Sequence, residues 1–279
     1  MMSTITPPLK YHGGKTYLAK WIQSLAPEGR YIHRVHPYGG GLGEFWNWPH
    51  EGISEVVNDI DGRLSYLWRV LQDDAMFAEF TRRIEAMPLS EPEWGCAATT
   101  DGNVSPVTIA VRFFVRIRQS RQGLMEDWAT LSRTRTRRGM NEQASAWLTA
   151  IEGLPEVHAR LKRVVITCGD GVELIRQQDG PKTLFYCDPP YLGPERSTPD
   201  TYAHEMTPEQ HKALLEALAH IEGFFMLSGY HNPMYDGWAN MPGIYLHEKR
   251  IDNKASGSKT KEVKTECVWT NYDAPKENS

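Results

Sequence analysis

An aspartate, two prolines and a tyrosine, Asp188-Pro189-Pro190-Tyr191, end an apolar run that begins at Thr183. Proline has a fixed φ and no backbone N–H, so the predicted strand stops there and the following turn is stiff. An ionised carboxylate only accepts hydrogen bonds, so Asp188 can receive one proton of an NH₂ group and the Pro189 carbonyl the other. Two such acceptors would offset the positive charge that develops on an amine during alkylation, with Tyr191 stacked on the ring that carries it. A plain Pro-Pro turn with a helix-capping aspartate explains the same residues, and the pattern alone leaves both interpretations open.

A glycine-rich segment and a later aspartate have the spacing of a nucleoside-binding site. Gly39, Gly40, Gly41 and Gly43 follow an extended segment, and glycines let backbone amides come close to a ligand. Asp59 ends the apolar run EVVND, 20 residues after Gly39. A doubly wound fold offers a carboxylate to ribose hydroxyls at this spacing. Hairpin turns explain many glycine clusters, but glycines, strand and terminal acid together predict a cofactor that contains a nucleoside.

The segment LKYHGGKT (9–16) has only part of the pattern of a phosphate-binding loop. That motif requires a glycine five residues before its Gly-Lys pair, and Leu9 stands there. The spacing therefore argues against an ATPase. Lys15 remains a candidate cation beside two glycines.

Basic residues gather in the middle of the chain although the net charge is −4. Eight arginines lie between positions 112 and 138, against Glu126 and Asp127; they are Arg112, Arg116, Arg118, Arg121, Arg133, Arg135, Arg137 and Arg138. Arginines interleaved with small polar residues are typical of a phosphate-contacting surface, and also of an ordinary solvated helix face. Arg112 and Arg116 flank an apolar stretch and are the best candidates for structural roles. The segment around 133–138 lacks hydrophobic periodicity and is expected to form a loop. A second basic run, 249–264, is the alternative phosphate-contacting surface.

Strand-like and helical segments alternate, which predicts an α/β fold with a mostly parallel central sheet. Strands are expected at 55–59, 163–170, 183–190 and 224–229, and a helical stretch follows the first of them through Ile84. Thr207, Pro208 and Gln210 predict the start of a further helix. Residues 80–159 contain no convincing strand. We therefore expect an α/β domain formed by 1–79 and 160–279, interrupted by a helical insertion at 80–159.

The composition is that of a soluble globular protein of the cytoplasm. The 279 residues are 40% hydrophobic and 24% charged, and no segment has the length and apolarity of a membrane span. The four cysteines lack paired spacing, which favours reduced thiols. The ten histidines show no metal-ligand spacing, so no metal is expected.

Seven segments, in this order, resemble the D12 (Dam-like) class of DNA adenine N6-methyltransferases, especially its phage and prophage branch. They are PLKYHGGK (8–15), HPYGGGLGEFWN (36–47), EVVNDIDGRLSYLWRVL (55–71), CGDGVELI (168–175), DPPY (188–191), FMLSGYHNPMYDGW (225–238) and KTECVWTNY (264–272). The resemblance covers nearly the whole chain. It implies a Rossmann-like methyltransferase fold, S-adenosylmethionine as methyl donor, and an adenine flipped out of double-stranded DNA as acceptor. It is compatible with a cognate restriction endonuclease as partner, in a bacterial or phage-infected cell.

The resemblance also implies roles for individual residues. Catalysis falls to Asp188, Pro189, Pro190 and Tyr191. Cofactor contacts fall to Tyr11, Lys15, Pro37, Tyr38, Gly39, Gly41, Asp59, Ile60, Asp170 and Gly171. DNA contacts fall to Lys10 and, within the insertion, to Arg118, Arg121, Arg133, Arg135, Arg137 and Arg138. Ser228, Gly229 and Tyr230 are expected to line the far wall of the base pocket, and His231 to be structural.

One departure and two alternatives qualify this interpretation. His36 stands where the family usually has an acid, which puts in question an acceptor near the methionine end of the cofactor. Transfer to cytosine N4 or to a protein amide is disfavoured, because those families usually carry Ser or Asn at the position of Asp188. A catalytically degenerate DNA-binding protein is the alternative of another class.

Overall fold

The computed structural model describes residues 4–11, 13–99, 103–129, 133–192, 205–252 and 263–274. The chain divides into two compact units. The first unit consists of residues 1–20, 40–49 and 61–168, and the second of residues 21–39, 50–60 and 169–279.

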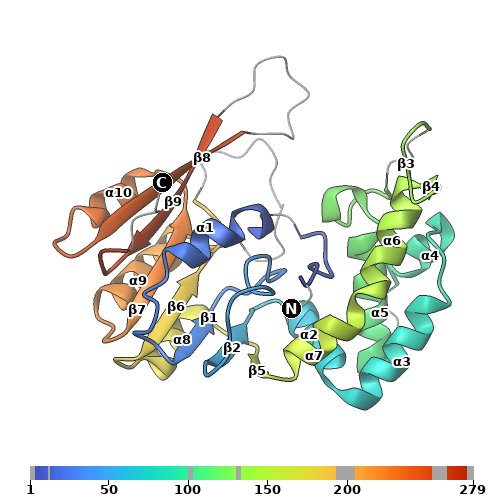
Figure 1. Cartoon of the computed structure of the whole chain (residues 1–279), viewed down its shortest axis with the longest axis horizontal. Helices are drawn as coiled ribbons and strands as arrows, with labels where there is room; N and C mark the ends of the chain where they lie inside the picture. Colours follow the sequence, from blue (N-terminus) through green and yellow to red (C-terminus); the bar gives the residue numbers. More distant parts are fainter. Residues whose placement is uncertain are drawn as a thin grey trace. The chain divides into compact units, whose positions relative to one another are not determined.

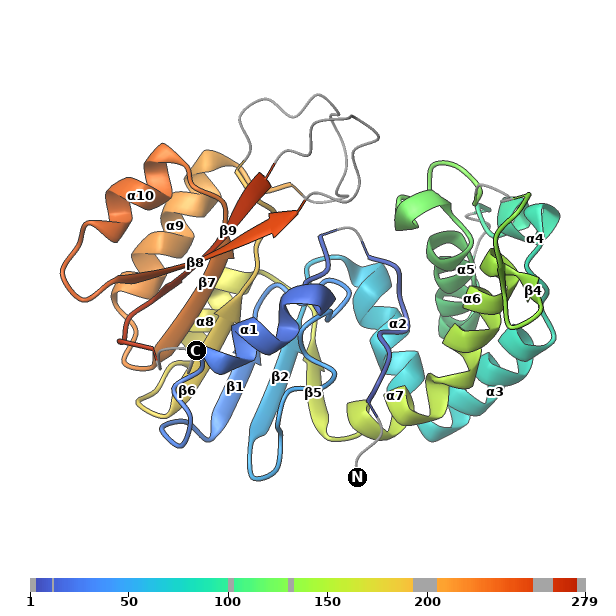
Figure 2. The ribbon, with the colours of Figure 1, turned by 45° about the horizontal axis from the view of Figure 1, so that its top comes forward.

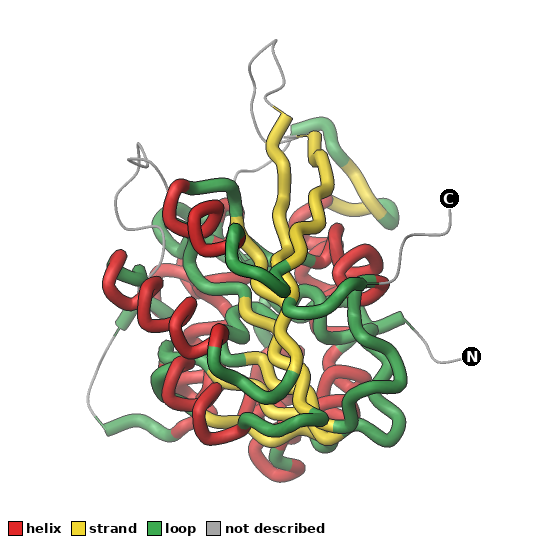
Figure 3. The backbone as a smooth tube through the Cα atoms, turned by 90° about the vertical axis from the view of Figure 1, so that its left-hand side faces the viewer, coloured by secondary structure: helices red, strands yellow, loops and turns green. Residues whose placement is uncertain are grey.

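The second unit contains six strands of a seven-stranded sheet, in the order β2-β1-β6-β7-β9-β8. Their bounds are β1 His33–His36, β2 Ser54–Asn58, β6 Thr183–Cys187, β7 Phe224–Gly229, β8 Tyr245–Asp252 and β9 Val263–Thr270. Neighbours among β2, β1, β6 and β7 run parallel, whereas β9 is antiparallel to both β7 and β8. The long β8–β9 pair runs side by side in Figure 3. The predicted α/β fold with a mostly parallel sheet is confirmed. The strand at 224–229 has the predicted bounds, and those at 55–59 and 183–190 are found with shifted ends.

Three helices cover one face of this sheet: α8 (Gly171–Gln178), α9 (Pro208–Ala219) and α10 (Pro233–Ala239) (Figure 2). Their apolar side chains form one core with Val35, Phe185 and Phe225 of the strands. α9 begins as predicted, since Thr207 and Gln210 form a reciprocal capping box and Pro208 occupies the first turn. The helices therefore hold the ends of β1, β6 and β7 in place.

The first unit is mainly helical (Figure 1). It contains α2 (Gly62–Gln72), α3 (Asp74–Glu85), α4 (Glu91–Cys96), α5 (Pro106–Arg118), α6 (Glu142–Glu152), α7 (Leu154–Leu161) and strand β5 (Val164–Thr167). Phe114 of α5 packs edge-on against Phe80 of α3, with 5.5 Å between ring centroids, and lies tilted against Trp147 of α6 at 5.7 Å. The short α1 (Ala19–Ser24) follows a 3-10 turn at Thr16–Leu18.

Two local expectations for this unit were wrong. The helical stretch after Asp59 is two helices, because the Asp73 side chain accepts from the Met76 amide and starts α3. α2 packs against α5 in this unit, and the expected division of the chain around an insertion at 80–159 stays a prediction. The second wrong expectation is the loop at 133–138, which contains a strand: β3 (Thr136–Arg137) pairs with β4 (Met140–Asn141). Arg138 and Gly139 have φ of 55° and 73°, the left-handed values of a two-residue hairpin turn.

Candidate active site

The Asp188–Tyr191 turn directly follows β6, whose five residues are all buried. β6 lies between β1 and β7, so the residues that follow these three parallel strands, Pro37–Gly39, Asp188–Tyr191 and Tyr230, belong to the same edge of the sheet. Ligands of open α/β sheets bind at this carboxyl edge. The structure thus places the predicted catalytic turn where such a fold holds its substrates.

Two residues hold Tyr191 in place: Tyr230, which follows β7, and Glu266 in β9. Its hydroxyl donates a short hydrogen bond to a carboxylate oxygen of Glu266 in β9. Its ring meets the Tyr230 ring edge-on, with 4.8 Å between centroids and an interplanar angle of 82°. Burial, together with the charges of Asp188 and Glu266, raises the pKa of Tyr191 well above its usual value. The tyrosine is therefore neutral and fixed in orientation.

Polar pairs inside the second unit support this turn. The hydroxyls of Tyr186 and Ser228, on β6 and β7, are 2.9 Å apart and buried. On the helical face, His211 Nδ1 lies 2.8 Å from the Tyr235 hydroxyl. Burial lowers the pKa of His211 to about 4, and an interaction with the Pro190 backbone partly offsets the shift. The imidazole is thus neutral next to the Asp188–Tyr191 turn.

The expected cofactor residues after β1 and β2 are joined through Asn58. The Gly39 amide donates to the Asn58 carbonyl at 2.7 Å. The Asn58 side-chain amide donates to the carbonyls of Pro37 and Gly169, at 2.9 Å each. Asn58 is 4% exposed. A single side chain therefore ties the loop at 37–39 to the loop before α8, and the sequence analysis missed it.

Tyr38 and Gly171 lie against each other within this arrangement. A Cβ atom on Gly171 would lie 2.7 Å from Cζ of Tyr38, so only glycine permits the contact. Burial raises the pKa of Tyr38 far above its usual value, with smaller contributions from Cys187 and Asp170. The two predicted cofactor residues thus form one packed wall.

The predicted acids take different positions. Asp59 follows β2 and is half-buried, and Ile60 next to it is 51% exposed, an unusual position for an apolar side chain. Asp170 caps α8, where its carboxylate accepts from the Glu173 amide at 2.9 Å. A capping role explains Asp170 without a ligand. His36, the departure from the family pattern, is buried, with its ring 5.7 Å from that of Tyr186.

Tyr11, Lys15 and Gly41 belong to the first unit. A Cβ on Gly41 would lie 2.4 Å from Cβ of Tyr11, and one on Gly43 would lie 2.7 Å from the Lys15 amide nitrogen. The glycine-rich segment is thus needed for close packing against the 10–16 segment. Lys15 is 4% exposed and donates to the Gly13 carbonyl at 3.1 Å. The role of these three residues toward the cofactor stays a prediction.

Lys10 lies among residues of the helical unit. Its ammonium donates to the Gln143 side chain at 3.1 Å, and a Cβ on Gly123 would lie 1.9 Å from the Lys10 carbonyl oxygen. Burial and the nearby Arg118 lower the pKa of Lys10 to about 8, against the opposing effect of Glu142. Ionisable side chains with a strongly shifted pKa are common at functional sites.

The eight arginines between positions 112 and 138 form two groups. Arg121, Arg133, Arg135, Arg137 and Arg138 are exposed. Arg138 pairs with both oxygens of Glu152 at 2.9 Å, and Arg135 lies 4.0 Å from Glu142.

The remaining arginines point into the unit. Arg118 donates to the Ala146 carbonyl at 2.7 Å, and burial lowers its pKa to about 10. Arg116 stacks on Trp94, 3.5 Å from the ring centroid, and Arg112 donates to the Thr99 carbonyl at 3.1 Å. Their contacts are those of packing residues, as the sequence indicated for Arg112 and Arg116 but not for Arg118.

Residues 11–252 match the model of the D12 class N6 adenine-specific DNA methyltransferase family. The chain therefore belongs to this family. The comparison with curated proteins found no match. Among solved structures, the chain is similar to the crystal structure of protein LPL1258 from Legionella pneumophila, with 13% identity and a TM-score of 0.30 over 99% of this chain and 88% of that one. A likeness at this score supports no further statement.

Membership of the family implies a methyltransferase that acts on DNA and uses S-adenosylmethionine. In the part of the chain that the structure describes, no helix is both long and apolar enough to cross a membrane.

Proposed function

We propose that the protein transfers a methyl group from S-adenosylmethionine to N6 of an adenine that is flipped out of a specific site in double-stranded DNA. The observation that carries this proposal is the position of Asp188–Tyr191 at the end of β6, beside the loop after β1 that Asn58 ties to the loop before α8. Extrusion of the base is needed because N6 is inaccessible to an active-site turn inside a stacked duplex.

The catalytic turn acts on the acceptor amine. The Asp188 carboxylate and the Pro189 carbonyl accept hydrogen bonds from the two N6–H groups, which draws the nitrogen lone pair out of the ring and offsets the positive charge that develops on N6. Pro190 fixes the turn, and Tyr191 stacks on the adenine in the orientation set by Glu266 and Tyr230. The carbon–sulfur bond of the methyl donor would break as the new carbon–nitrogen bond forms, and one N6 proton would then pass to solvent.

The second unit offers groups that suit S-adenosylmethionine, which supplies an activated methyl group on sulfur. Asp59 can accept from ribose hydroxyls, and Asp170 can accept from the adenine amine with the carboxylate oxygen turned away from the helix cap. Pro37, Tyr38, Gly39, Ile60 and Gly171 would form the walls of the site. Exposure of Ile60 at this edge supports an apolar contact with the adenine ring.

DNA contacts are proposed for Lys10, Arg121, Arg133, Arg135, Arg137 and Arg138. A two-stranded ribbon fits the major groove of DNA, and β3–β4 carries Arg137 in a strand and Arg138 in its turn. Arg118 is the weakest of the predicted DNA contacts, because its guanidinium is used within the unit.

The decisive test is Asp188→Ala in a methyl-transfer assay. Purified parent and variant are given radiolabelled S-adenosylmethionine and DNA, and the modified nucleoside is identified by mass spectrometry after digestion. We expect N6-methyladenine from the parent and a loss on the order of 10²-fold or more in the variant, the effect of removing one preorganised polar group. Cofactor affinity, measured by calorimetry, should stay nearly unchanged.

Glu216→Ala is the matched control, since Glu216 is an exposed acid on α9. Near-parental activity in Asp188→Ala would contradict the mechanism. If the product is N4-methylcytosine, the acceptor is cytosine and not adenine. If the parent protein binds DNA but no cofactor, it is the catalytically degenerate DNA-binding protein.

A further inference from the structure

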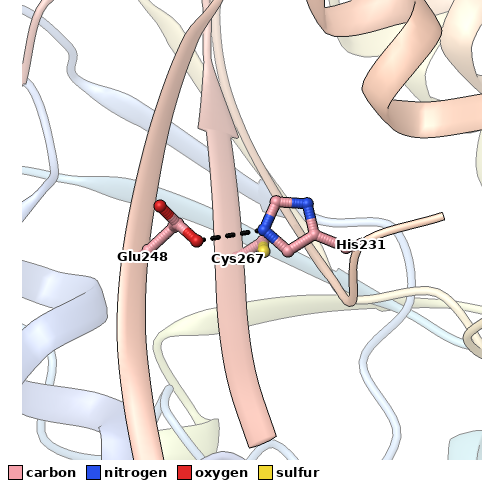
Figure 4. Close-up of side chains that lie close together, drawn as sticks. All are labelled: His231, Glu248 and Cys267. Carbon is pink, nitrogen blue, oxygen red and sulfur yellow. Dashed lines mark hydrogen bonds and ion pairs between the residues drawn. The ribbon is translucent and has the colours of Figure 1, made fainter. Parts of the chain in front are cut away.

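Three side chains outside the catalytic turn bring metal-ligand atoms together (Figure 4). They are His231, which follows β7, Glu248 on β8 and Cys267 on β9. Their ligand atoms all lie within 4.8 Å of one another, and His231 Nε2 is 3.0 Å from a Glu248 oxygen. Nitrogen, carboxylate oxygen and thiol sulfur are the three ligand types that zinc takes in proteins.

The backbone places these ligands with little freedom. Glu248 and Cys267 are direct partners in the antiparallel β8–β9 pair, so their side chains project from the same face of the sheet. Cys267 is also the partner of Gly229 in β7, two residues before His231. The Cys267 thiol is buried beneath the two exposed side chains, which leaves the solvent side open for a water molecule as fourth ligand.

His231 is oriented by a further carboxylate. Its Nδ1 lies 2.8 Å from Asp236, which directs Nε2 toward Glu248 and Cys267. In zinc sites, the histidine ligand usually donates the N–H of its other ring nitrogen to an outer carboxylate or carbonyl oxygen. The Trp269 ring, edge-on at 6.4 Å between centroids, packs beside the imidazole.

We propose that His231, Glu248 and Cys267 form a binding site for a divalent cation of the zinc type. The cation takes the place of the protons on His231 Nε2 and on the thiol. A cysteine ligand must lose its thiol proton, so the site requires an ion that binds thiolate strongly. This requirement selects zinc over magnesium or calcium, which prefer oxygen ligands.

Such an ion would stabilise residues that contact the catalytic tyrosine. Tyr230 precedes His231, and Glu266 precedes Cys267, and both contact Tyr191. An ion that links β7, β8 and β9 would therefore hold the wall around Tyr191 in place. Its role is structural, and metal binding is measurable without methyl transfer, so it stands apart from the proposed function.

The test is metal binding by the full-length protein after treatment with a chelator. Calorimetry with Zn²⁺ should give one ion per chain. Co²⁺ in place of zinc should give the near-ultraviolet charge-transfer band that reports a thiolate ligand. Cys267→Ser should remove the band, and Asp236→Asn should weaken zinc binding by about 10- to 100-fold, the effect of losing an outer-layer partner.

Matched controls come from exposed residues of the same types. Cys168→Ser and His220→Gln should bind zinc as the parent does. Glu248→Gln keeps an exposed side chain of the same shape, so it tests the site without disturbing the core. A cobalt spectrum without the thiolate band, or zinc affinity unchanged in both Cys267→Ser and Glu248→Gln, would overturn the proposal and leave the cluster as an ion pair of His231 with Asp236 and Glu248.

Discussion

Asn58 offers a sharp test of how the cofactor loops are held, because aspartate has nearly the same shape and lacks the donor. Asn58→Ala removes two buried hydrogen bonds, to the carbonyls of Pro37 and Gly169. Each is worth about 0.5–1.5 kcal/mol, and more if the carbonyl is left unsatisfied. We therefore expect the free energy of unfolding to fall by about 2–3 kcal/mol, measured by urea denaturation.

Asn58→Asp should be worse than Asn58→Ala at neutral pH, because a buried carboxylate would face two carbonyl oxygens. This repulsion and burial raise the pKa of the new carboxyl above its unfolded value, about 3.9. The extra loss of stability should thus disappear near pH 4 and grow as the pH rises through the folded pKa. Cofactor affinity should fall with both substitutions. Asp59→Asn serves as control, with weaker cofactor binding and a smaller loss of stability. An Asn58→Asp protein as stable as Asn58→Ala at neutral pH would refute the reasoning.

Two further predictions concern titratable groups. Lys10 has a pKa of about 8 and is cationic below that pH. DNA affinity, measured by fluorescence anisotropy, should therefore fall as the pH rises through 8. Lys10→Met should remove this dependence, and a variant with the same pH profile as the parent would contradict a DNA contact by Lys10. His211 has a folded pKa of about 4 against a usual value of 6.5, so the unfolded state binds more protons between these values. Stability should therefore fall as the pH drops from 6.5 toward 4, and His211→Gln should flatten this slope in thermal unfolding; equal slopes would contradict the assignment.

The sequence predicted features that depend on neighbouring residues along the chain. Thr207, Pro208 and Gln210 carry a complete helix-start signal, and β7 at 224–229 was predicted to the residue. The same kind of signal was present at Asp73, which caps α3, and it was overlooked. The strand ends that carry Asp59 and Asp188 were recognisable because an acid follows an apolar run.

Features that depend on tertiary contacts could not be predicted in this way. Asn58 gains its importance from a carbonyl 111 residues later in the chain. The β3–β4 turn uses Arg138 with positive φ, whereas asparagine and glycine dominate such turns, so the usual signal was missing. The cluster of His231, Glu248 and Cys267 assembles from three segments through strand pairing, and no local spacing reveals it.

The buried acid behind Tyr191 bears on the choice between an active enzyme and a degenerate DNA-binding protein. Glu266 is 0% exposed and contacts Tyr191, and burying a carboxylate costs several kcal/mol unless its partners compensate. A fold that only binds DNA gains nothing from this cost.

The double variant Glu266→Leu/Tyr191→Phe replaces the pair by apolar groups, so we expect stability within about 1 kcal/mol of the parent, or above it. Glu266→Leu alone should be less stable than the double variant, because the buried tyrosine hydroxyl loses its acceptor. Methyl transfer by the double variant should fall, because the ring is no longer held in place. A double variant that methylates DNA at the parental rate would show that this contact has no part in the reaction.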